Sequence, residues 1–251
     1  MLLVIDVGNT GTVIGIVDGE AVIARWEITT TARTADEYVL AIEALLGSGG
    51  YRVSAAALAS VVPEATRVLR AALPRITGSP PVVVGPGVRT GLSIDLDNAR
   101  EVGADRVAGA VGAIDRYGAP VITVDFGTAT TVDLVDAASS FRGGAIAVGI
   151  GVGAEALVAS TSALRRVELS EPSHSVGRST VEAVQSGMVF GFAGLVDGLV
   201  ARMRDEAGVE PRAVVATGGF AHLIGPLCDQ ITHVDADLTL WGLALIHRRN
   251  M

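Results

Sequence analysis

The sequence predicts an α/β protein made of two duplicated halves. Short apolar runs typical of buried strands alternate with helix-like segments, and one strand–turn–strand motif occurs twice. Hydrophobic residues make up 49% of the chain but aromatic residues only 4%, so the core must consist of Ala, Val, Leu and Ile. With 251 residues, the chain has room for two domains of about 120 residues each.

The repeated motif is a buried strand, a tight glycine turn and a returning strand. Its copies run over residues 2–17 and 121–135. In each copy an aspartate ends the first strand, and a glycine two residues later lets the backbone turn. The copies lie about half the chain apart, as expected after tandem duplication. Their superposition pairs Asp6 with Asp125, Gly8 with Gly127, and Val13 with Val132.

Both turns carry hydroxyl side chains that could surround a phosphate together with backbone N–H groups. A tight hairpin without a ligand is the alternative for either turn taken alone. Two such turns at half-chain spacing favour phosphate binding. The threonines concerned are Thr10 and Thr12 in the first copy, and Thr128, Thr130 and Thr131 in the second.

The first half is expected to begin as a β-meander and continue as a βαβ unit. Thr34 to Glu37 has capping-box spacing, and Pro63 is well placed to begin a helix. The expected domain boundary lies at 116–120, which gives domains 1–117 and 118–251. The expected elements are a hairpin turn at 18–19, strands at 20–30, 55–62 and 82–84, a loop or short strand at 91–98, and helices at 34–46, 63–73 and from about 104.

The second half is expected to contain more helix. The glycine-rich segment 141–149 fits a regular element poorly, so we expect either a plain loop or a backbone that approaches a ligand. A strand at 213–217 leads through a Gly-Gly turn into a helix at 220–227, which suits nucleotide contact or simple packing. Helices are also expected at 154–164 and, after capping-box spacing from Ser179, over the apolar stretch 183–200.

The apolar helix at 183–200 has few charges, so burial on more than one side is expected. Four glycines leave small faces along which another helix could approach. We therefore predict a homodimer interface there. Gln185, Asp197 and the glycines argue against a membrane span. The glycines are Gly187, Gly191, Gly194 and Gly198.

Charge and residue usage exclude several classes of function. The formal net charge is −8 and basic clusters are nearly absent, so a nucleic-acid partner is not expected. The chain contains no lysine, which excludes a P-loop lysine, a protein-kinase strand lysine and a Schiff base. Phosphate charge must be met by metal, arginine and backbone N–H groups.

The remaining residues of interest for chemistry favour a reducing, cytoplasmic setting. Cys228 is the only cysteine, so an internal disulfide is excluded. Its side chain is expected to be a small buried hydrophobe. Asp6 interrupts the first apolar run, so that run is not expected to be a signal peptide. The four histidines lack metal-ligand spacing and are expected to be structural or solvated: His174, His222, His233 and His247.

Asp105 and Arg106 are expected in the first turn of a helix. An aspartate at this position often only complements the helix dipole. A cation there is unfavourable and needs another reason, such as binding a carboxylate or phosphate. Both interpretations of Asp105 remain open at the level of this segment alone.

Five motifs occur in this order: Asp6 to Thr10, Gly103 to Arg106, Asp125 to Thr131, Gly143 to Ile146, and Thr217 to Gly219. Together they closely resemble type III pantothenate kinases, and the likeness runs from Met1 to about Asn250. The resemblance implies the actin-like, sugar-kinase-like ATPase fold, in which two duplicated, ribonuclease H-like α/β domains enclose a nucleotide cleft. It implies phosphorylation of pantothenate by ATP, the first step towards coenzyme A, in a homodimer that needs Mg²⁺ and a monovalent cation, K⁺ or NH₄⁺.

The resemblance also implies roles for individual residues. Asp105 would be the general base and Asp125 would bind the monovalent cation. Asp6 would organise Mg²⁺. ATP would be held by Asp6, Val7, Gly8, Asn9, Thr10, Gly11, Thr12 and Val13 in the first turn, and by Thr128 in the second. Pantothenate would be held by Gly103, Ala104, Asp105 and Arg106, and by Thr180, the last in the neighbouring subunit's pocket.

Three positions depart from the family pattern: Glu27 and Ala99 stand where arginine and proline are usual, and Val148 where proline is usual. They bear on loop rigidity and substrate affinity, and leave the three aspartates intact. Two alternatives to the kinase are a non-catalytic regulator on the same scaffold and another small-molecule kinase or phosphatase of the superfamily. The three aspartates argue against the first, and the Gly103 to Arg106 segment against the second.

Overall fold

The computed structural model describes residues 1–161 and 165–251, which form two compact units. The first unit contains residues 1–116 and 237–251, and the second contains 117–236. Residues 237–251 were expected in the second domain (118–251), and this part of the predicted division is wrong. The expected helix at 154–164 ends in residues that lie outside the described part of the chain.

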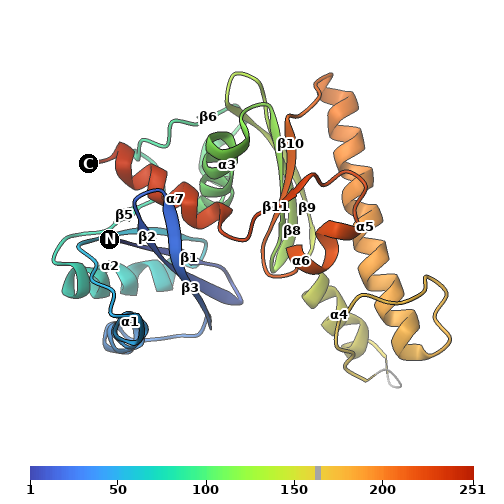
Figure 1. The fold of residues 1–251 in the computed structure, drawn as a ribbon, viewed down its shortest axis with the longest axis horizontal. Helices are drawn as coiled ribbons and strands as arrows, with labels where there is room; N and C mark the ends of the chain where they lie inside the picture. Colours follow the sequence, from blue (N-terminus) through green and yellow to red (C-terminus); the bar gives the residue numbers. More distant parts are fainter. Residues whose placement is uncertain (162–164) are drawn as a thin grey trace. The chain divides into compact units, whose positions relative to one another are not determined.

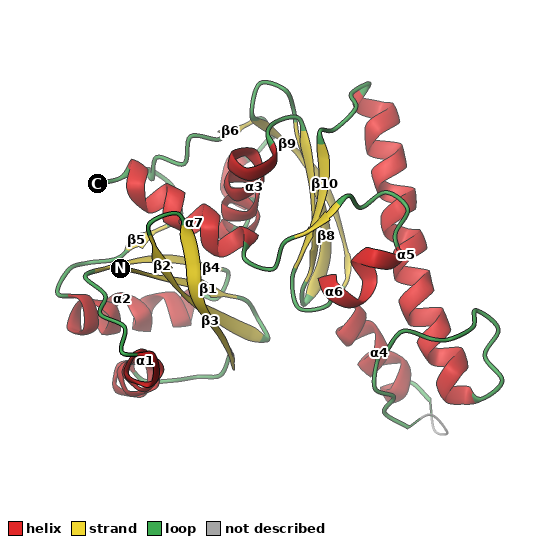
Figure 2. Cartoon of the chain, viewed as in Figure 1, coloured by secondary structure: helices red, strands yellow, loops and turns green. Residues whose placement is uncertain are grey.

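The first unit is a five-stranded sheet in the order β3-β2-β1-β4-β5 (Figures 1 and 2). β1 and β2 are antiparallel, as are β2 and β3, while β1, β4 and β5 are parallel. Its elements are β1 (Leu2–Val7), β2 (Gly11–Asp18), β3 (Ala21–Thr29), α1 (Ala35–Gly49), β4 (Ala55–Ser60), α2 (Pro63–Thr77), β5 (Val82–Val83), β6 (Ser93–Ile94), the 3₁₀ helix η1 (Ala99–Glu101), α3 (Ala104–Tyr117) and α7 (Leu238–Arg249).

The predicted elements of this unit are largely confirmed. Thr34 and Glu37 form the capping box of α1, and Pro63 opens α2. Both helices are longer than expected: α1 includes Gly47 to Gly49, and α2 continues through Pro74 to Thr77. The helices pack on one face of the sheet through an apolar core that outweighs the weak helix propensity of those glycines.

The C-terminal helix α7 packs on β1 and β4 of the first unit, opposite α1 and α2 (Figure 1). Its side chains from Leu238 to Ile246 are mostly buried because they complete this second face of the sheet. Gly242 lets α7 approach α3 closely, since a Cβ there would lie 1.8 Å from the carbonyl oxygen of Ala108. The indole N–H of Trp241 also donates to the Asp115 carboxylate at 2.8 Å.

The second unit repeats this topology, with strands in the order β11-β10-β7-β8-β9. β7, β10 and β11 are parallel, and β7, β8 and β9 form an antiparallel meander. The strand order therefore supports the duplication. Its elements are β7 (Val121–Phe126), β8 (Ala129–Val135), β9 (Ser140–Val148), α4 (Ile150–Ala159), α5 (Thr180–Ala207), β10 (Ala213–Thr217), α6 (Ala221–Ile224), the 3₁₀ helix η2 (Gly225–Leu227) and β11 (His233–Val234).

The predicted superposition of the two motifs is wrong by one residue on the returning strand. Asp6 pairs with Val13, whereas Asp125 pairs with Thr131 and not with Val132. The second turn is thus one residue shorter. Such a difference cannot be seen in a sequence offset fixed only by the aspartate and glycine.

Residues 141–149 are not a loop, because nearly all of them belong to β9. Gly143 has φ of +101° and lies at a register shift where Arg142 bulges out of the pairing with β8. Gly144 approaches β8 so closely that a Cβ would lie 2.0 Å from the carbonyl oxygen of Val132. The glycines therefore permit the strand instead of interrupting it.

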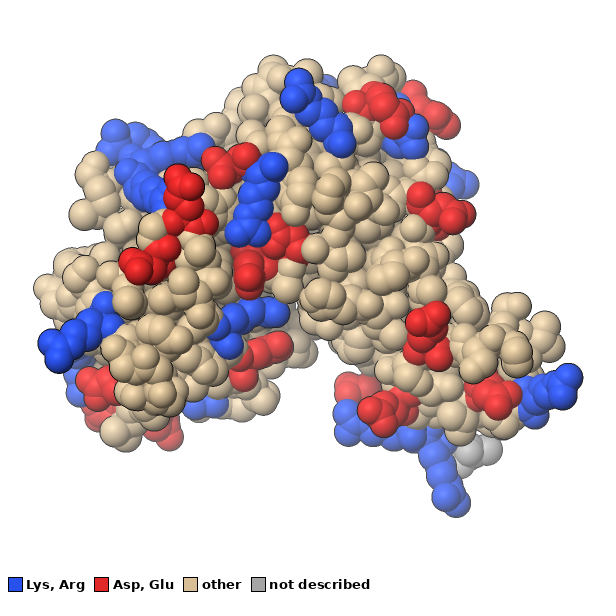
Figure 3. All heavy atoms as spheres, in the orientation of Figure 1, with Lys and Arg blue, Asp and Glu red and all other residues tan. Residues whose placement is uncertain are grey.

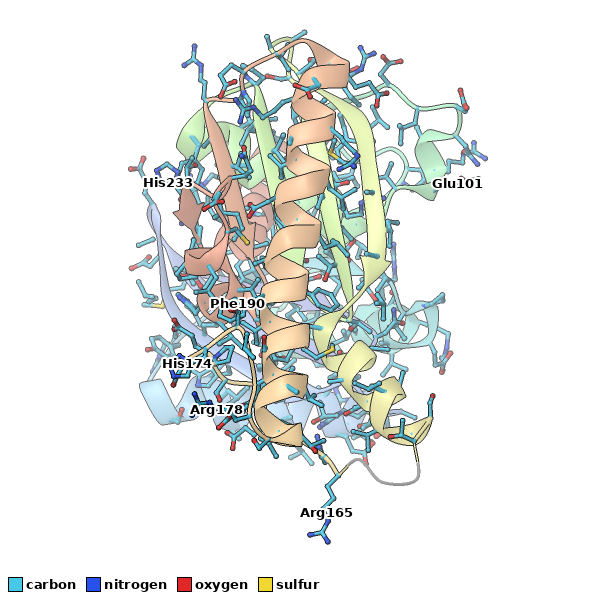
Figure 4. The ribbon with its side chains drawn as sticks, turned by 90° about the vertical axis from the view of Figure 1, so that its right-hand side faces the viewer. Glu101, Arg165, His174, Arg178, Phe190 and His233 are labelled. Carbon is cyan, nitrogen blue, oxygen red and sulfur yellow. The ribbon has the colours of Figure 1, made fainter. Side chains whose placement is uncertain are left out.

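Helix α5 crosses the sheet of its unit and buries one face against it (Figure 4). Val189, Phe192 and Val196 pack into the core with Ile122 and Phe126. Among the described helices, α5 alone is long and apolar enough to cross a bilayer by length and composition, a test that core helices of soluble proteins also pass.

Candidate active site

The first turn is held in shape by short hydrogen bonds within the first unit. The N–H of Gly8 donates to the carbonyl of Gly11 at 2.9 Å, which closes the turn between β1 and β2. The hydroxyls of Thr12 and Thr30 are 2.8 Å apart, and the N–H of Thr30 donates to the carbonyl of Thr10 at 2.9 Å. The turn is therefore braced by the residue that follows β3.

The predicted ATP-binding residues differ in what they can offer. Asn9 and Thr10 are exposed, and Asp6 is half-buried at the end of β1. Val7 is fully buried, so only its backbone is available to a ligand. The hydroxyl of Thr12 is engaged with Thr30, so its role is to stabilise the turn. Gly8, Gly11 and Val13 are half-buried and line the remainder of the turn.

Asp105 lies in the first turn of α3, as expected. Its carboxylate accepts from the N–H of Arg106 at 2.8 Å and bends back over Gly103, where a Cβ would lie 2.3 Å from Oδ1. Gly103 is therefore required to be small. Gly103, Ala104, Asp105 and Arg106 are all half-buried.

Val61 connects the Asp105 segment to the first turn. Its N–H donates to the carbonyl of Val7 at 3.1 Å. Its Cγ1 lies 3.5 Å from the position that a Cβ on Gly103 would occupy. Within the first unit, Val61 therefore links the end of β1, which carries Asp6, to the segment that carries Asp105. Sequence reasoning missed Val61, because an apolar residue after a strand gives no signal of this role.

The second turn lies at the centre of the second unit's sheet. The N–H of Gly127 donates to the carbonyl of Ala129 at 3.1 Å, and that of Gly149 donates to the carbonyl of Thr128 at 3.1 Å. A Cβ on Gly149 would lie 2.3 Å from the Thr128 carbonyl oxygen, so this contact requires glycine. The same Cβ would lie 2.4 Å from the carbonyl oxygen of Gly127, and a Cβ on Gly127 would lie 3.5 Å from Oδ1 of Asp125, so these oxygens are close together.

The Gly-Gly turn after β10 meets this second turn. Thr217 pairs with Asp125, and the N–H of Phe220 donates to the carbonyl of Phe126 at 3.3 Å. Gly218 has φ of +93°, and a Cβ there would lie 2.3 Å from Oδ1 of Asp125. Asp125 therefore lies between two glycine turns. The predicted strand-to-helix turn at 217–220 is confirmed.

Phe220 also lines a cavity of about 820 Å³ in the second unit. The cavity lies between α4 and α5 and is mostly apolar, with one arginine and two glutamates at its wall. Its position beside the Gly-Gly turn is compatible with a planar aromatic ligand group. The residues concerned include Gly151, Val158, Arg166, Glu168, Val184 and Phe220.

Thr180, the remaining predicted substrate residue, is the first residue of α5 and is exposed. The cap of this helix is Ser179, whose hydroxyl accepts from the N–H of Glu182 at 3.2 Å. Thr180 belongs to the second unit, whereas Gly103 to Arg106 belong to the first.

Cys228 is buried as expected, and burial raises the pKa of its thiol to about 12.

The oxygen donors fit the metals that the resemblance implies. Among the described residues, no group of three or more His, Cys, Asp or Glu side chains could by itself hold a metal ion. Mg²⁺ commonly binds one or two carboxylates together with nucleotide phosphates, so Asp6 fits an ion that arrives with ATP. Asp125 with its neighbouring carbonyls fits a hard monovalent cation. Acidic and arginine side chains are interspersed on the face drawn in Figure 3.

Solved structures with similar folds confirm the predicted fold class. A ROK family glucokinase from Streptomyces griseus, solved with glucose and AMPPNP, matches at a TM-score of 0.53 over 96% of this chain and 98% of its own, with 16% identity. A structure named as a conserved putative Baf family transcriptional activator from Campylobacter jejuni matches at a TM-score of 0.62 over 99% of this chain and 98% of its own, with 17% identity. At such identities the likeness shows the fold alone, so the second match does not support a regulatory role.

Sequence relatives are much closer and share one family. Type III pantothenate kinases from Anaeromyxobacter sp. strain K and Mycobacterium avium are each 46% identical to this chain, over 254 and 259 residues. The alignments cover all of this chain, and 100% and 96% of the relatives. The model of the family described as type III pantothenate kinase matches residues 2–202. The chain therefore belongs to the type III pantothenate kinase family.

Proposed function

We propose that this protein transfers the γ-phosphoryl group of ATP to the primary hydroxyl of pantothenate, the first step towards coenzyme A. Membership of the family supports the reaction. The observation that carries the mechanism is that Val61 donates a hydrogen bond to the end of β1 and also lies near Gly103, over which the Asp105 carboxylate bends. A proton acceptor and a phosphate-binding turn thus lie together in one unit.

In this mechanism Asp105 orients the hydroxyl of pantothenate and accepts its proton as the new O–P bond forms and ADP leaves. Arg106 binds the carboxylate of pantothenate, since a guanidinium fork matches a carboxylate. Gly103 leaves room for the Asp105 side chain to reach this position. The backbone of Gly8 to Val13 holds the phosphates, which is required in a chain without lysine.

The second unit carries proposed nucleotide contacts of its own. Thr128 contacts a phosphate, and the Gly218 turn lies beside the base, for which the cavity at Phe220 is available. Asp6 would hold Mg²⁺ and Asp125 would hold K⁺ or NH₄⁺. When bound, these cations neutralise charge that develops on the phosphoryl oxygens.

The protein acts as a cytoplasmic homodimer joined along α5. Gly187, Gly191 and Gly194 are exposed, and a Cβ added at any of them would meet nothing within 4 Å. This open face of small residues suits close approach of the same helix from a second copy. Thr180 lies at the start of that helix and contacts pantothenate bound in the partner.

Turnover of the purified protein tests the proposal. ATP and pantothenate are supplied with Mg²⁺ in K⁺ buffer and in Na⁺ buffer, and phosphopantothenate is measured by mass spectrometry. We expect product that depends on pantothenate and forms faster in K⁺. A folded protein without product in either buffer would contradict the proposal. Equal turnover in both buffers would support the kinase activity but contradict the proposed binding of a monovalent cation by Asp125.

A further inference from the structure

Glu27 lies over the first phosphate turn. It is on β3 opposite Val13, and its side chain reaches diagonally across the strand pair to Gly11. A Cβ on Gly11 would lie 2.5 Å from Oε1 of Glu27 and 3.4 Å from Cδ. The carboxylate therefore occupies the space that the missing side chain of Gly11 leaves open.

Within the described part of the chain, Glu27 makes no ion pair with an arginine. The acids that do so include Asp36 and Glu64. The flanking Trp26 and Ile28 pack against the core, which directs Glu27 to the other face of the sheet. An exposed strand carboxylate is usually only solvated, but this one lies against the backbone that is proposed to hold phosphates.

A carboxylate at this place has opposite effects on two forms of ATP. It repels the bare polyphosphate, because two like charges a few ångströms apart interact unfavourably near a protein surface. It does not repel the Mg²⁺ complex to the same extent, since the cation lowers the charge of the nucleotide and its water shell can donate hydrogen bonds to a carboxylate. The Glu27 carboxylate can take this position only because Gly11 has no side chain.

We propose that Glu27 is a specificity-determining residue that makes the first turn select Mg²⁺-bound ATP over metal-free ATP. The inference rests on the proposed function, because it assumes that phosphates bind at Gly8 to Val13. It assigns to Glu27 no contact with the reacting atoms. Its effect is on nucleotide binding and not on the rate of phosphoryl transfer.

The test measures ATP binding by isothermal titration calorimetry in Mg²⁺ and in EDTA at low salt, where surface charges are least screened. Three proteins are compared: the natural protein, Glu27→Gln and Glu20→Gln. Glu20 is an exposed acid at the far end of the β2–β3 hairpin, so its variant changes the net charge equally. The circular dichroism spectrum of each variant checks that it is folded.

For Glu27→Gln we expect metal-free ATP to bind about five- to tenfold more tightly, with much less change for the Mg²⁺ complex. The ratio of the two dissociation constants should be unchanged in Glu20→Gln. An unchanged ratio in folded Glu27→Gln, or an equal change in both variants, would overturn the inference while leaving the kinase intact. Failure of the natural protein to bind ATP with Mg²⁺ would instead overturn the proposed function and this inference with it.

Discussion

Replacing Gly218 with alanine should destabilise the second unit and displace Asp125. Gly218 has φ of +93°, which costs a residue with a Cβ about 1–2 kcal/mol. The new Cβ would also lie 2.3 Å from Oδ1 of Asp125 and 2.7 Å from the backbone carbon of Phe126. Such overpacking costs about 1–3 kcal/mol. Together these effects predict a loss of about 2–5 kcal/mol in the free energy of unfolding.

Cys228 provides a probe for this measurement, because it is buried in the core of the second unit. Labelling of its thiol across a urea series reports the unfolding of that unit. The matched control is Gly219→Ala, since a Cβ on Gly219 would meet nothing within 4 Å. We expect the control to change the free energy of unfolding by less than about 0.5 kcal/mol.

The two variants should also differ in their response to K⁺. Displacement of Asp125 in Gly218→Ala should raise the K⁺ concentration needed for half-maximal turnover, and Gly219→Ala should leave it unchanged. If both variants had the same urea midpoint and the same K⁺ dependence, the close contact between Gly218 and Asp125 would be refuted.

Three further predictions concern other parts of the chain. Gly191→Arg should weaken the homodimer while the protomer stays folded, because the glycine lies on the open face of α5. A variant that is still entirely dimeric by sedimentation velocity would contradict this interface. The thiol of Cys228 should react with iodoacetamide at pH 8 at least about 100-fold more slowly in the folded protein than in urea, because burial raises its pKa to about 12. Equal rates would show that the thiol is accessible in the folded protein. Burial, and to a lesser extent Arg248, lowers the pKa of His247. The contribution of His247 to stability is therefore present above the ordinary histidine pKa and is lost as the pH falls through the lowered value. His247→Gln should flatten the pH dependence of the free energy of unfolding below about pH 6.5, and an unchanged slope would contradict the assignment.

Local patterns predicted the parts of the fold that depend on neighbouring residues. The capping box at Thr34, the proline at the start of α2 and the glycine turn after β10 all appear in the structure. Asp105 also lies in the first helical turn, as its spacing indicated. These features are governed by side chains within a few positions of one another, so the sequence alone specifies them.

The parts that the sequence did not reveal depend on contacts between distant segments. Nothing in the composition of α7 shows that it packs on the first unit, because its apolar side chains would cover either sheet. The glycines of β9 argued against a regular element in the sequence. The bulge that makes Gly143 favourable exists only when β9 is paired with β8. The hydrogen bond between Thr12 and Thr30 and the position of Val61 near Gly103 likewise exist only in the folded chain.

The position of Glu27 shows the same limit for the site. Its sequence neighbours indicate only an exposed strand residue. Its proximity to Gly11 arises from the register of β2 and β3, which a single sequence does not fix. A departure from the family pattern therefore became a testable property only through the structure.

Replacement of Asp105 with asparagine tests the central claim most directly, since it removes the proposed proton acceptor and keeps the shape of the side chain. We predict that turnover of pantothenate falls at least about 100-fold, while ATP with Mg²⁺ still binds measurably by calorimetry. Near-normal turnover by a folded Asp105→Asn variant would contradict the assignment of Asp105 as the general base.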